Sequence, residues 1–152
     1  MESIPTQVTV SSRLPVTPGT LWGAVVSTEG INHEMGPWLK FTPPGEIDLL
    51  STAAGGEVLP LKIRGPFGLP LGRYPLKLER FEEGRGFLEQ TWMLPFLLWQ
   101  HERKIEADGD GVKVTDALGW RWKLALLDPL VRAGVGAFFR HRHRRLRHRF
   151  EP

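Results

Sequence analysis

The 152-residue sequence contains no cysteine, which excludes disulfides, thiolate metal sites, iron–sulfur clusters and thiol nucleophiles. It lacks an uncharged apolar run of the roughly 18 residues that a membrane-spanning helix needs, and its first residues do not have the pattern of a secretory signal. We therefore expect a cytoplasmic protein. None of the signatures H-E-x-x-H, Walker loop, G-x-G-x-x-G after a strand or G-x-S-x-G is present. We accordingly predict no metal site and no cofactor, and we assign no catalytic residue.

Charge is unevenly distributed along the chain. The net charge is +3, yet residues 140–152 alone hold six arginines and one glutamate. Such a segment could neutralise the phosphates of a nucleic acid or of anionic lipids. Arginines at these positions would point all round a helix, which disfavours nucleic acid as a partner. Three interpretations stay open: a solvated helix end, which is favoured, contact with an anionic membrane through Arg142, Arg144 and Arg145, and binding of nucleic acid, which is the least favoured.

The length of the chain predicts one domain spanning residues 1–152. In its first third, the residue pattern predicts one strand followed by two short helices. Polar and apolar residues alternate over 6–14, which is typical of a half-buried strand. Thr17 and Pro18 predict the start of a helix that Gly30 ends. A second helical segment is expected over 31–38.

Short apolar runs between turn residues predict an antiparallel sheet in the middle of the chain. The expected strands are 46–51, 57–64, 74–82, 86–93, 97–107 and 111–122. The Asp-Gly pairs at 108–111 predict a hairpin between the last two strands. Residues 65–72 are expected to form a long apolar loop, and Asp128 is expected to cap a long helix over 128–150.

This order of elements, together with local motifs, resembles the SRPBCC superfamily, which includes START lipid-transfer domains, birch-pollen-allergen-like proteins and polyketide cyclases. The motifs are Phe87-Leu88-Glu89-Gln90, Pro95-Phe96, Trp99-Gln100-His101-Glu102-Arg103, Thr115-Asp116 and the segment from Phe139 to Leu146. The resemblance implies an α+β helix-grip fold, in which a curved antiparallel sheet of about seven strands wraps around the C-terminal helix and leaves a cavity. Arg103 departs from the family pattern, which has a second histidine at this position.

Polar residues on the inward face of strand 97–107 are the main candidates for a site. Alternation places Trp99, His101 and Arg103 on this face, and Asp116 on the neighbouring strand is their expected partner. Buried charges need partners. The sequence leaves open whether these residues form a structural network, orient the polar end of a ligand, or act as an acid–base pair.

The six tryptophans and eight phenylalanines suit a cavity for a hydrophobic ligand. We expect Trp99, Trp120 and Phe138 to line it, and Phe67 and Leu69 to lie at its mouth. The leading hypothesis is binding or transport of a hydrophobic or amphipathic small molecule, such as a lipid, quinone or polyketide. The alternatives are a polyketide cyclase or dehydratase that uses the same cavity, and an accessory protein that acts at a membrane surface through the arginine-rich helix.

Overall fold

The computed structural model describes residues 3–47, 49–94 and 97–151. The motif residues Pro95 and Phe96 lie outside this part of the chain. The elements are, in order, β1 (Val8–Leu14), α1 (Pro18–Val26), α2 (Thr28–Met35), β2 (Lys40–Thr42), α3 (Leu49–Ala53), β3 (Leu59–Arg64), η1 (Pro66–Gly68), β4 (Pro70–Leu76), β5 (Leu78–Glu82), β6 (Gly86–Leu94), β7 (Leu97–Asp108), β8 (Gly111–Trp122), η2 (Ala125–Leu127) and α4 (Asp128–Phe150).

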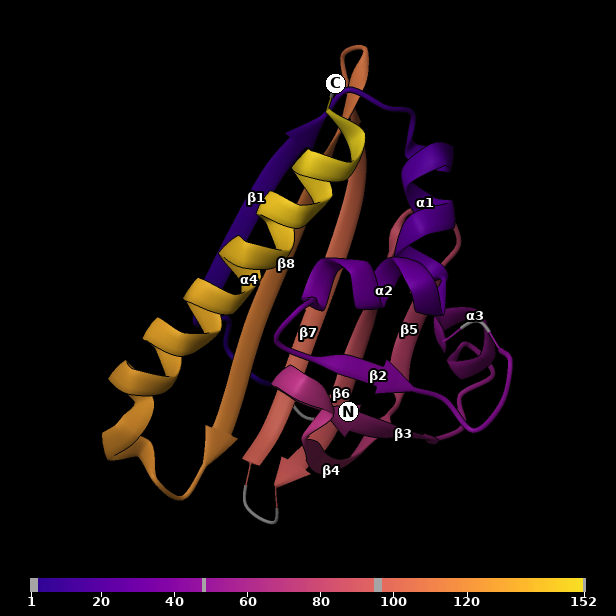
Figure 1. Cartoon of the computed structure of the whole chain (residues 1–152). Coiled ribbons are helices and arrows are strands. Elements are labelled where there is room, and N and C mark those ends of the chain that lie inside the picture. Colours follow the sequence, from indigo (N-terminus) through magenta and orange to yellow (C-terminus); the bar gives the residue numbers. More distant parts are fainter. Residues whose placement is uncertain (1–2, 48, 95–96, 152) are drawn as a thin grey trace.

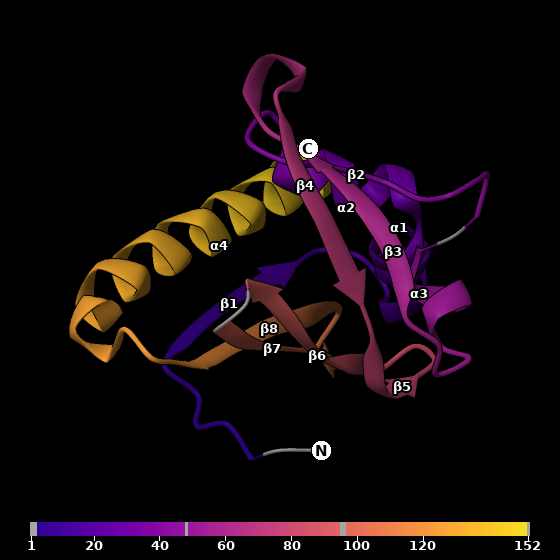
Figure 2. The ribbon, with the colours of Figure 1, turned by 90° about the horizontal axis from the view of Figure 1, so that it is seen from below.

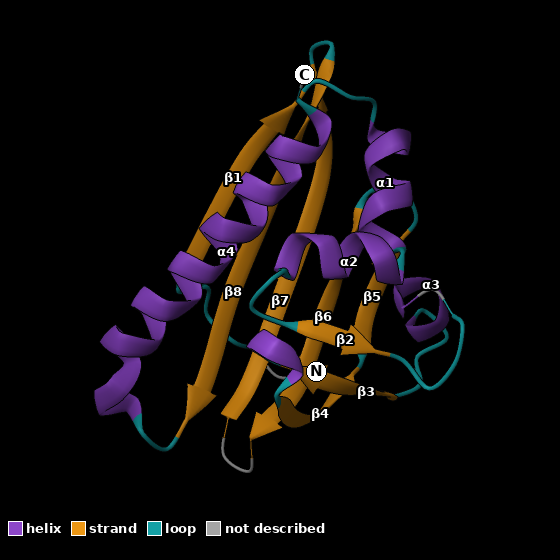
Figure 3. Cartoon of the chain, viewed as in Figure 1, coloured by secondary structure: helices purple, strands orange, loops and turns teal. Residues whose placement is uncertain are grey.

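The strands form two antiparallel sheets, one with the order β1-β8-β7-β6-β5 and one with the order β2-β3-β4. Helix α4 crosses the concave side of the larger sheet, and the smaller sheet lies over the same side (Figures 1 and 2). The helices thus lie on one side of the five-stranded sheet (Figure 3). This is the predicted helix-grip arrangement, with two short helices after the first strand and a long C-terminal helix.

The boundary between the first two helices differs from the prediction. Helix α1 begins as expected, with Thr17 as N-cap, but it ends at Val26, and Ser27 caps the start of α2 by accepting a hydrogen bond from Gly30 N. Gly30 therefore lies inside α2. A Cβ at this position would lie 1.8 Å from Ala24 O, so glycine is needed because α1 and α2 pack closely here.

The segment between α2 and β3 was predicted incorrectly. Residues 49–51 begin helix α3 instead of forming a strand, because Leu50 and Ala53 share a buried helical face. The short strand β2 was missed. It depends on a contact between α2 and β2, in which the Asn32 side chain binds Phe41 N and Phe41 O at 2.8 and 2.9 Å. The expected loop over 65–72 contains η1, and β4 already begins at Pro70.

Helix α4 occupies the predicted range, but Asp128 is not its cap. The N-cap is Leu127, without a side-chain hydrogen bond. The Asp128 carboxylate instead accepts hydrogen bonds from Trp120 Nε1 at 3.1 Å and Trp122 Nε1 at 2.8 Å. Asp128 therefore ties the start of the helix to the end of β8.

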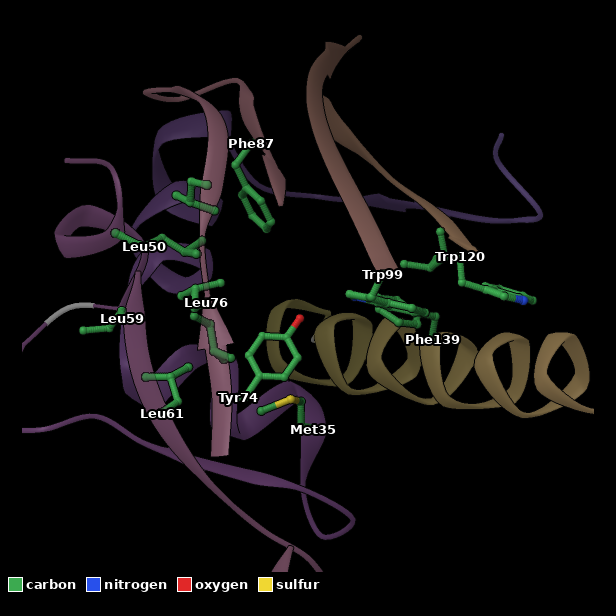
Figure 4. Packing of buried hydrophobic residues seen from close by; sticks show 14 residues of the cluster. Met35, Leu50, Leu59, Leu61, Tyr74, Leu76, Phe87, Trp99, Trp120 and Phe139 are labelled. Carbon is green, nitrogen blue, oxygen red and sulfur yellow. The ribbon is translucent and has the colours of Figure 1, made fainter. Parts of the chain in front are cut away.

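Two clusters of buried apolar side chains fill the space between the sheet and the helices. One includes Trp99, Trp120 and Phe139, with ring centroids 6.3 Å apart in the Trp99–Trp120 and Trp99–Phe139 pairs (Figure 4). The other, at the opposite end of β7, β8 and α4, includes Ile105 and Leu146. Each of these three long elements contributes to both clusters, and the residues between the two clusters form the candidate site.

Candidate functional site

A cluster of buried charged side chains separates the two apolar clusters. Along β7, His101 and Arg103 lie between Trp99 and Ile105, and along β8, Asp116 lies between Val114 and Leu118. Helices α2 and α4 complete it. We call this set of residues the ionic cluster; its members are Glu34, Glu89, His101, Arg103, Asp116, Arg142 and His143.

Arg103 is the centre of the ionic cluster. Its guanidinium binds Asp116 through Nε at 2.8 Å and Nη2 at 2.7 Å. It binds Glu34 through Nη1 at 2.9 Å and Nη2 at 2.8 Å. The planar guanidinium fork suits two carboxylates in this way, whereas a lysine could not reproduce the geometry. Arg103 thus joins α2 to the two central strands.

Both buried histidines bind the same carboxylate. His101 Nε2 lies 2.7 Å from Asp116 Oδ1, and His143 Nε2 lies 2.7 Å from Asp116 Oδ2. An ionised carboxylate only accepts hydrogen bonds, so both histidines donate through Nε2. His143 Nδ1 contacts Ser12 Oγ at 2.7 Å, and Arg147 Nη1 donates to the same hydroxyl oxygen. The Ser12 hydroxyl proton is therefore free to bind His143 Nδ1.

The surroundings of the buried carboxyls favour their charged forms. Burial alone raises the pKa of Asp116, but Arg103 and His101 outweigh it and hold this pKa well below its ordinary value. Burial likewise opposes ionisation of Glu34, whereas Arg103 and Arg142 lower its pKa overall. The same carboxylates raise the pKa of Arg103 well above its usual value despite burial. The site therefore holds paired ions.

A second carboxylate lies on the other side of His101. Glu89 Oε1 lies 3.7 Å from His101 Nδ1, and Tyr74 donates its hydroxyl proton to Glu89 Oε2. Burial and the neighbouring Glu89 together raise the pKa of Tyr74 well above its ordinary value. Phe87 and Phe139 pack edge-to-face against the His101 ring. His101 is thus held between two carboxylates and two aromatic rings.

Arg142 is less completely satisfied than Arg103. Its Nη2 lies 3.2 Å from Glu34 Oε1, and its guanidinium lies 4.9 Å from the centroid of the Phe139 ring. Its Nε is buried without a hydrogen-bond partner among the described residues. A buried donor without a partner is rare, because leaving it unsatisfied costs about 1–3 kcal/mol. Arg142 Nε is therefore positioned for an acceptor supplied by water or by a ligand.

A small cavity borders the ionic cluster. Its volume is about 40 Å³, enough for a water molecule but far below the roughly 300–1,000 Å³ of typical ligand pockets. One part of its wall is polar and consists of Glu89, His101, Arg103 and Arg142. The rest is apolar and consists of Val25, Ile31, Phe41, Leu50, Leu76 and Phe87. The cavity is therefore small and amphipathic.

The structure brings together only some of the predicted ligand-binding residues. His101, Arg103 and Asp116 meet as expected, and the predicted partnership with Asp116 is confirmed. Trp99 and Trp120 are buried next to α4 and Phe138 is half-buried, but none of the three lines the cavity, contrary to the prediction. Phe67 and Leu69 lie in and beside η1, where both side chains are exposed, away from the residues that line the cavity.

The three arginines predicted to meet a membrane have different environments. Arg142 belongs to the buried ionic cluster. Arg145 Nε donates to His33 O at 2.9 Å and is half-buried, whereas Arg144 is exposed. Burial and the neighbouring Arg145 lower the pKa of His33. Only Arg144 of the three is thus fully available to a partner at the surface.

Sequence reasoning missed Glu34, Glu89 and His143 as members of the same cluster. Glu34 follows Ile31 by three residues, so it lies on the buried face of α2, and Glu89 occupies an inward position on β6. His143 lies between Phe139 and Leu146 at helical spacing and shares their apolar stripe. The signal that could have identified these residues is a polar side chain among the apolar residues of a buried face.

Two further observations concern membranes and metals. No described helix is long and apolar enough to cross a membrane. Within residues 3–47, 49–94 and 97–151, no group of three or more histidine, aspartate or glutamate side chains is arranged to hold a metal ion.

Comparison with solved structures identifies the fold. The structure matches protein CV1439 from Chromobacterium violaceum at a TM-score of 0.74 and 8% identity, covering 97% of this chain and 99% of that chain. It matches a START superfamily protein from Mycobacterium smegmatis at 0.68 and 15% identity, covering 95% and 96%. It matches Ara h 8.0201 at 0.60 and 16% identity, covering 93% and 96%. The chain therefore has the helix-grip fold of START-like proteins, and the predicted resemblance is confirmed for the fold.

A family model places the chain more narrowly. Residues 12–150 match a family described as a domain of unknown function, DUF8410, and the chain belongs to this family. No curated protein matches the sequence.

Proposed function

We propose that this protein binds a small amphipathic molecule between its sheet and α4. The apolar part of the ligand lies among the aromatic and aliphatic side chains of the interior, and its polar end lies at the ionic cluster. The helix-grip fold supports this proposal, since START-like proteins share it. Fold alone does not define function, so the proposal depends on the chemistry of the cavity.

One observation carries the proposal: the cavity has a polar and an apolar wall, and one residue of the polar wall, Arg142, has a buried donor without a partner among the described residues. Arg142 Nε has no acceptor among the described residues, and Arg142 lines the cavity. A purely structural network would satisfy this donor within the protein or through an ordered water molecule. A ligand oxygen at the polar wall would supply the missing acceptor.

The charges of the ionic cluster favour a neutral acceptor on the ligand. Glu34, Glu89 and Asp116 already place three carboxyl groups beside the arginines. A ligand carboxylate would add a further acidic group, whose burial is costly without a cation of its own. A carbonyl or ether oxygen accepts a hydrogen bond without adding charge. A ketone, quinone or ester group is therefore the expected polar end.

Binding requires the interior to open, because a cavity of about 40 Å³ admits no such molecule. The first two turns of α4 contain no buried residue, and Asp128 ties them to β8 through its hydrogen bonds with Trp120 and Trp122. The buried residues of α4 begin at Gly136, whereas Val131 and Val135 are half-buried and Leu130 is 72% exposed. Movement of these turns away from Trp99 and Trp120 would enlarge the space beside the aromatic rings. The ligand thus binds a minor, open conformation of the chain and stabilises it.

Titration with Nile red tests the proposal. This neutral dye carries a carbonyl acceptor, and its fluorescence increases in an apolar environment. We expect saturable binding with one dye per chain. Leu50→Phe should weaken binding because it fills the cavity. Arg142→Met should weaken it about tenfold because it removes the unpartnered donor while keeping the aliphatic stem, and a hydrogen bond to a charged group contributes about 1.5–3 kcal/mol.

Arg144→Met is the matched control, since Arg144 lies on the exposed side of the same helix. It should bind the dye as the unmodified chain does. Thermal unfolding of each variant separates lost binding from lost folding. The proposal is wrong if the folded chain does not bind the dye, or if Leu50→Phe and Arg142→Met bind it with unchanged affinity.

A further inference from the structure

The three-stranded sheet presents a basic surface to solvent. Leu61 and Tyr74 point inward to the core, whereas the alternating positions on β3 and β4 are exposed. The exposed charged side chains of this sheet are Lys40, Lys62, Arg64 and Arg73, which we call the basic face. Residues 58–78 contain no aspartate or glutamate, so this part of the chain offers the basic face no carboxylate.

The cations of the basic face lie opposite one another. Lys40 pairs in register with Arg64, and Lys62 pairs with Arg73. Cβ atoms of directly opposed residues in an antiparallel pair are about 4.5–5.5 Å apart, and like charges at this separation repel. None of the four forms an ion pair with a described residue. The sheet therefore maintains two unfavourable charge pairs that an anionic partner would relieve.

An apolar tip adjoins the basic face. Phe67, in η1 between β3 and β4, is 108% exposed, and its φ of 61° is left-handed, a conformation that a bulky residue rarely adopts. Leu69 and Leu71 are also more than half exposed. Trp38, two residues before Lys40, is 52% exposed and lies against His141 of α4. We call Phe67, Leu69 and Leu71 the apolar tip.

We propose that the basic face and the apolar tip together dock on a bilayer that contains anionic phospholipid. The cations would bind the headgroup phosphates, and the apolar tip would enter the boundary between headgroups and acyl chains. A nucleic acid would use the cations but leave Phe67 and the leucines in water. A membrane interface uses both features, since binding there combines buried apolar area with attraction to anionic lipid.

This surface is distinct from the arginine-rich end of α4. It lies on the smaller sheet, which covers the concave side of the five-stranded sheet next to α4 (Figures 1 and 2). The inner face of the smaller sheet contributes Phe41 and Leu76 to the cavity wall. Docking would therefore bring the sheet that covers the cavity against lipid. The docking proposal does not depend on ligand binding, because it can be measured on vesicles without a ligand.

Co-sedimentation with phosphatidylcholine vesicles, with and without phosphatidylglycerol, tests the inference. We expect the chain to bind only vesicles that contain phosphatidylglycerol. The double variant Lys62→Gln, Arg73→Gln should bind about 25-fold more weakly, since each basic residue near an anionic surface contributes about fivefold. The matched control is Arg140→Gln with Arg144→Gln, two exposed arginines of α4, and it should retain binding.

Phe67→Gly tests the apolar tip separately. Glycine adopts the left-handed conformation without strain, so this variant should fold, and its thermal unfolding midpoint should be higher than that of the unmodified chain. Its vesicle binding should nevertheless fall several-fold, even at high salt. The inference is overturned if the unmodified chain ignores anionic vesicles, or if the α4 variant loses binding and the basic-face variant does not. Binding to an RNA oligonucleotide through Lys62 and Arg73, without vesicle binding, would also overturn it.

Discussion

Replacement of Arg103 by methionine removes the centre of the ionic cluster. Four hydrogen bonds of 2.7–2.9 Å to Glu34 and Asp116 would be lost, and both carboxylates would stay buried with fewer cations. Breaking a buried ion pair by removing one partner costs about 3–5 kcal/mol. With a urea m-value of about 1–3 kcal/mol/M, the unfolding midpoint at neutral pH should fall by roughly 2 M.

Arg80→Met is the control for this experiment. Arg80 pairs with Glu102 across the strands, but its side chain is 42% exposed, so the pair should contribute about 0–1 kcal/mol. A second control adds Glu34→Gln and Asp116→Asn to Arg103→Met. This triple variant should lose less stability than the sum of the losses measured for the three single variants, because it contains no uncompensated buried charge. A loss below about 1 kcal/mol for Arg103→Met, or strict additivity, would refute the reasoning.

Three further predictions follow from the same structure. The folded-state pKa values of Asp116 and Glu34 lie below the ordinary 3.8 and 4.5, so the stability that these carboxylates contribute is complete above those values and is lost as pH falls below them. The thermal unfolding midpoint should therefore drop at acidic pH, and Asp116→Asn should weaken this pH dependence. Gly86→Ala should destabilise the chain by more than about 2 kcal/mol, since a Cβ would lie 2.0 Å from Arg103 O, whereas Gly134→Ala, with open space around it, should stabilise α4 by up to about 1 kcal/mol in urea unfolding; equal effects would contradict the packing described. Amide hydrogen exchange should be faster over 131–135 than over 139–146, and equal protection would argue against opening at the start of α4.

Local patterns predicted most of the fold. The alternation over 97–107 and 111–122 and the Asp-Gly turn between them gave a hairpin whose register brings Arg103 opposite Asp116. The errors occur where tertiary contacts decide. Asn32 holds the three residues of β2 in place through Phe41, and Gly30 lies inside a helix because Ala24 packs against it. Both contacts join residues that are near in sequence, but the residue types involved do not by themselves indicate that the contacts form.

The candidate site was predictable in part for the same reason. Strand alternation identified His101, Arg103 and Asp116, because a charged residue on an inward face is conspicuous. Glu34 joins the cluster from 69 residues away along the chain, and only the folded structure brings α2 to β7. Arg142 looked like a surface arginine because its neighbours in sequence are basic, yet it follows the buried Phe139 by three residues and contacts Glu34. Sequence reasoning therefore identified His101 and Arg103 of the polar wall and missed Glu89 and Arg142.

Native mass spectrometry of the protein purified from its own host, followed by denaturing extraction, tests whether the chain binds a ligand. We expect a co-purifying small molecule in a ratio of one per chain, largely apolar and with a neutral oxygen acceptor. That molecule should be reduced or lost in Arg142→Met and retained in Arg144→Met. A chain that is empty in every preparation, and that also fails to bind Nile red, would contradict the claim and leave the ionic cluster a structural role alone.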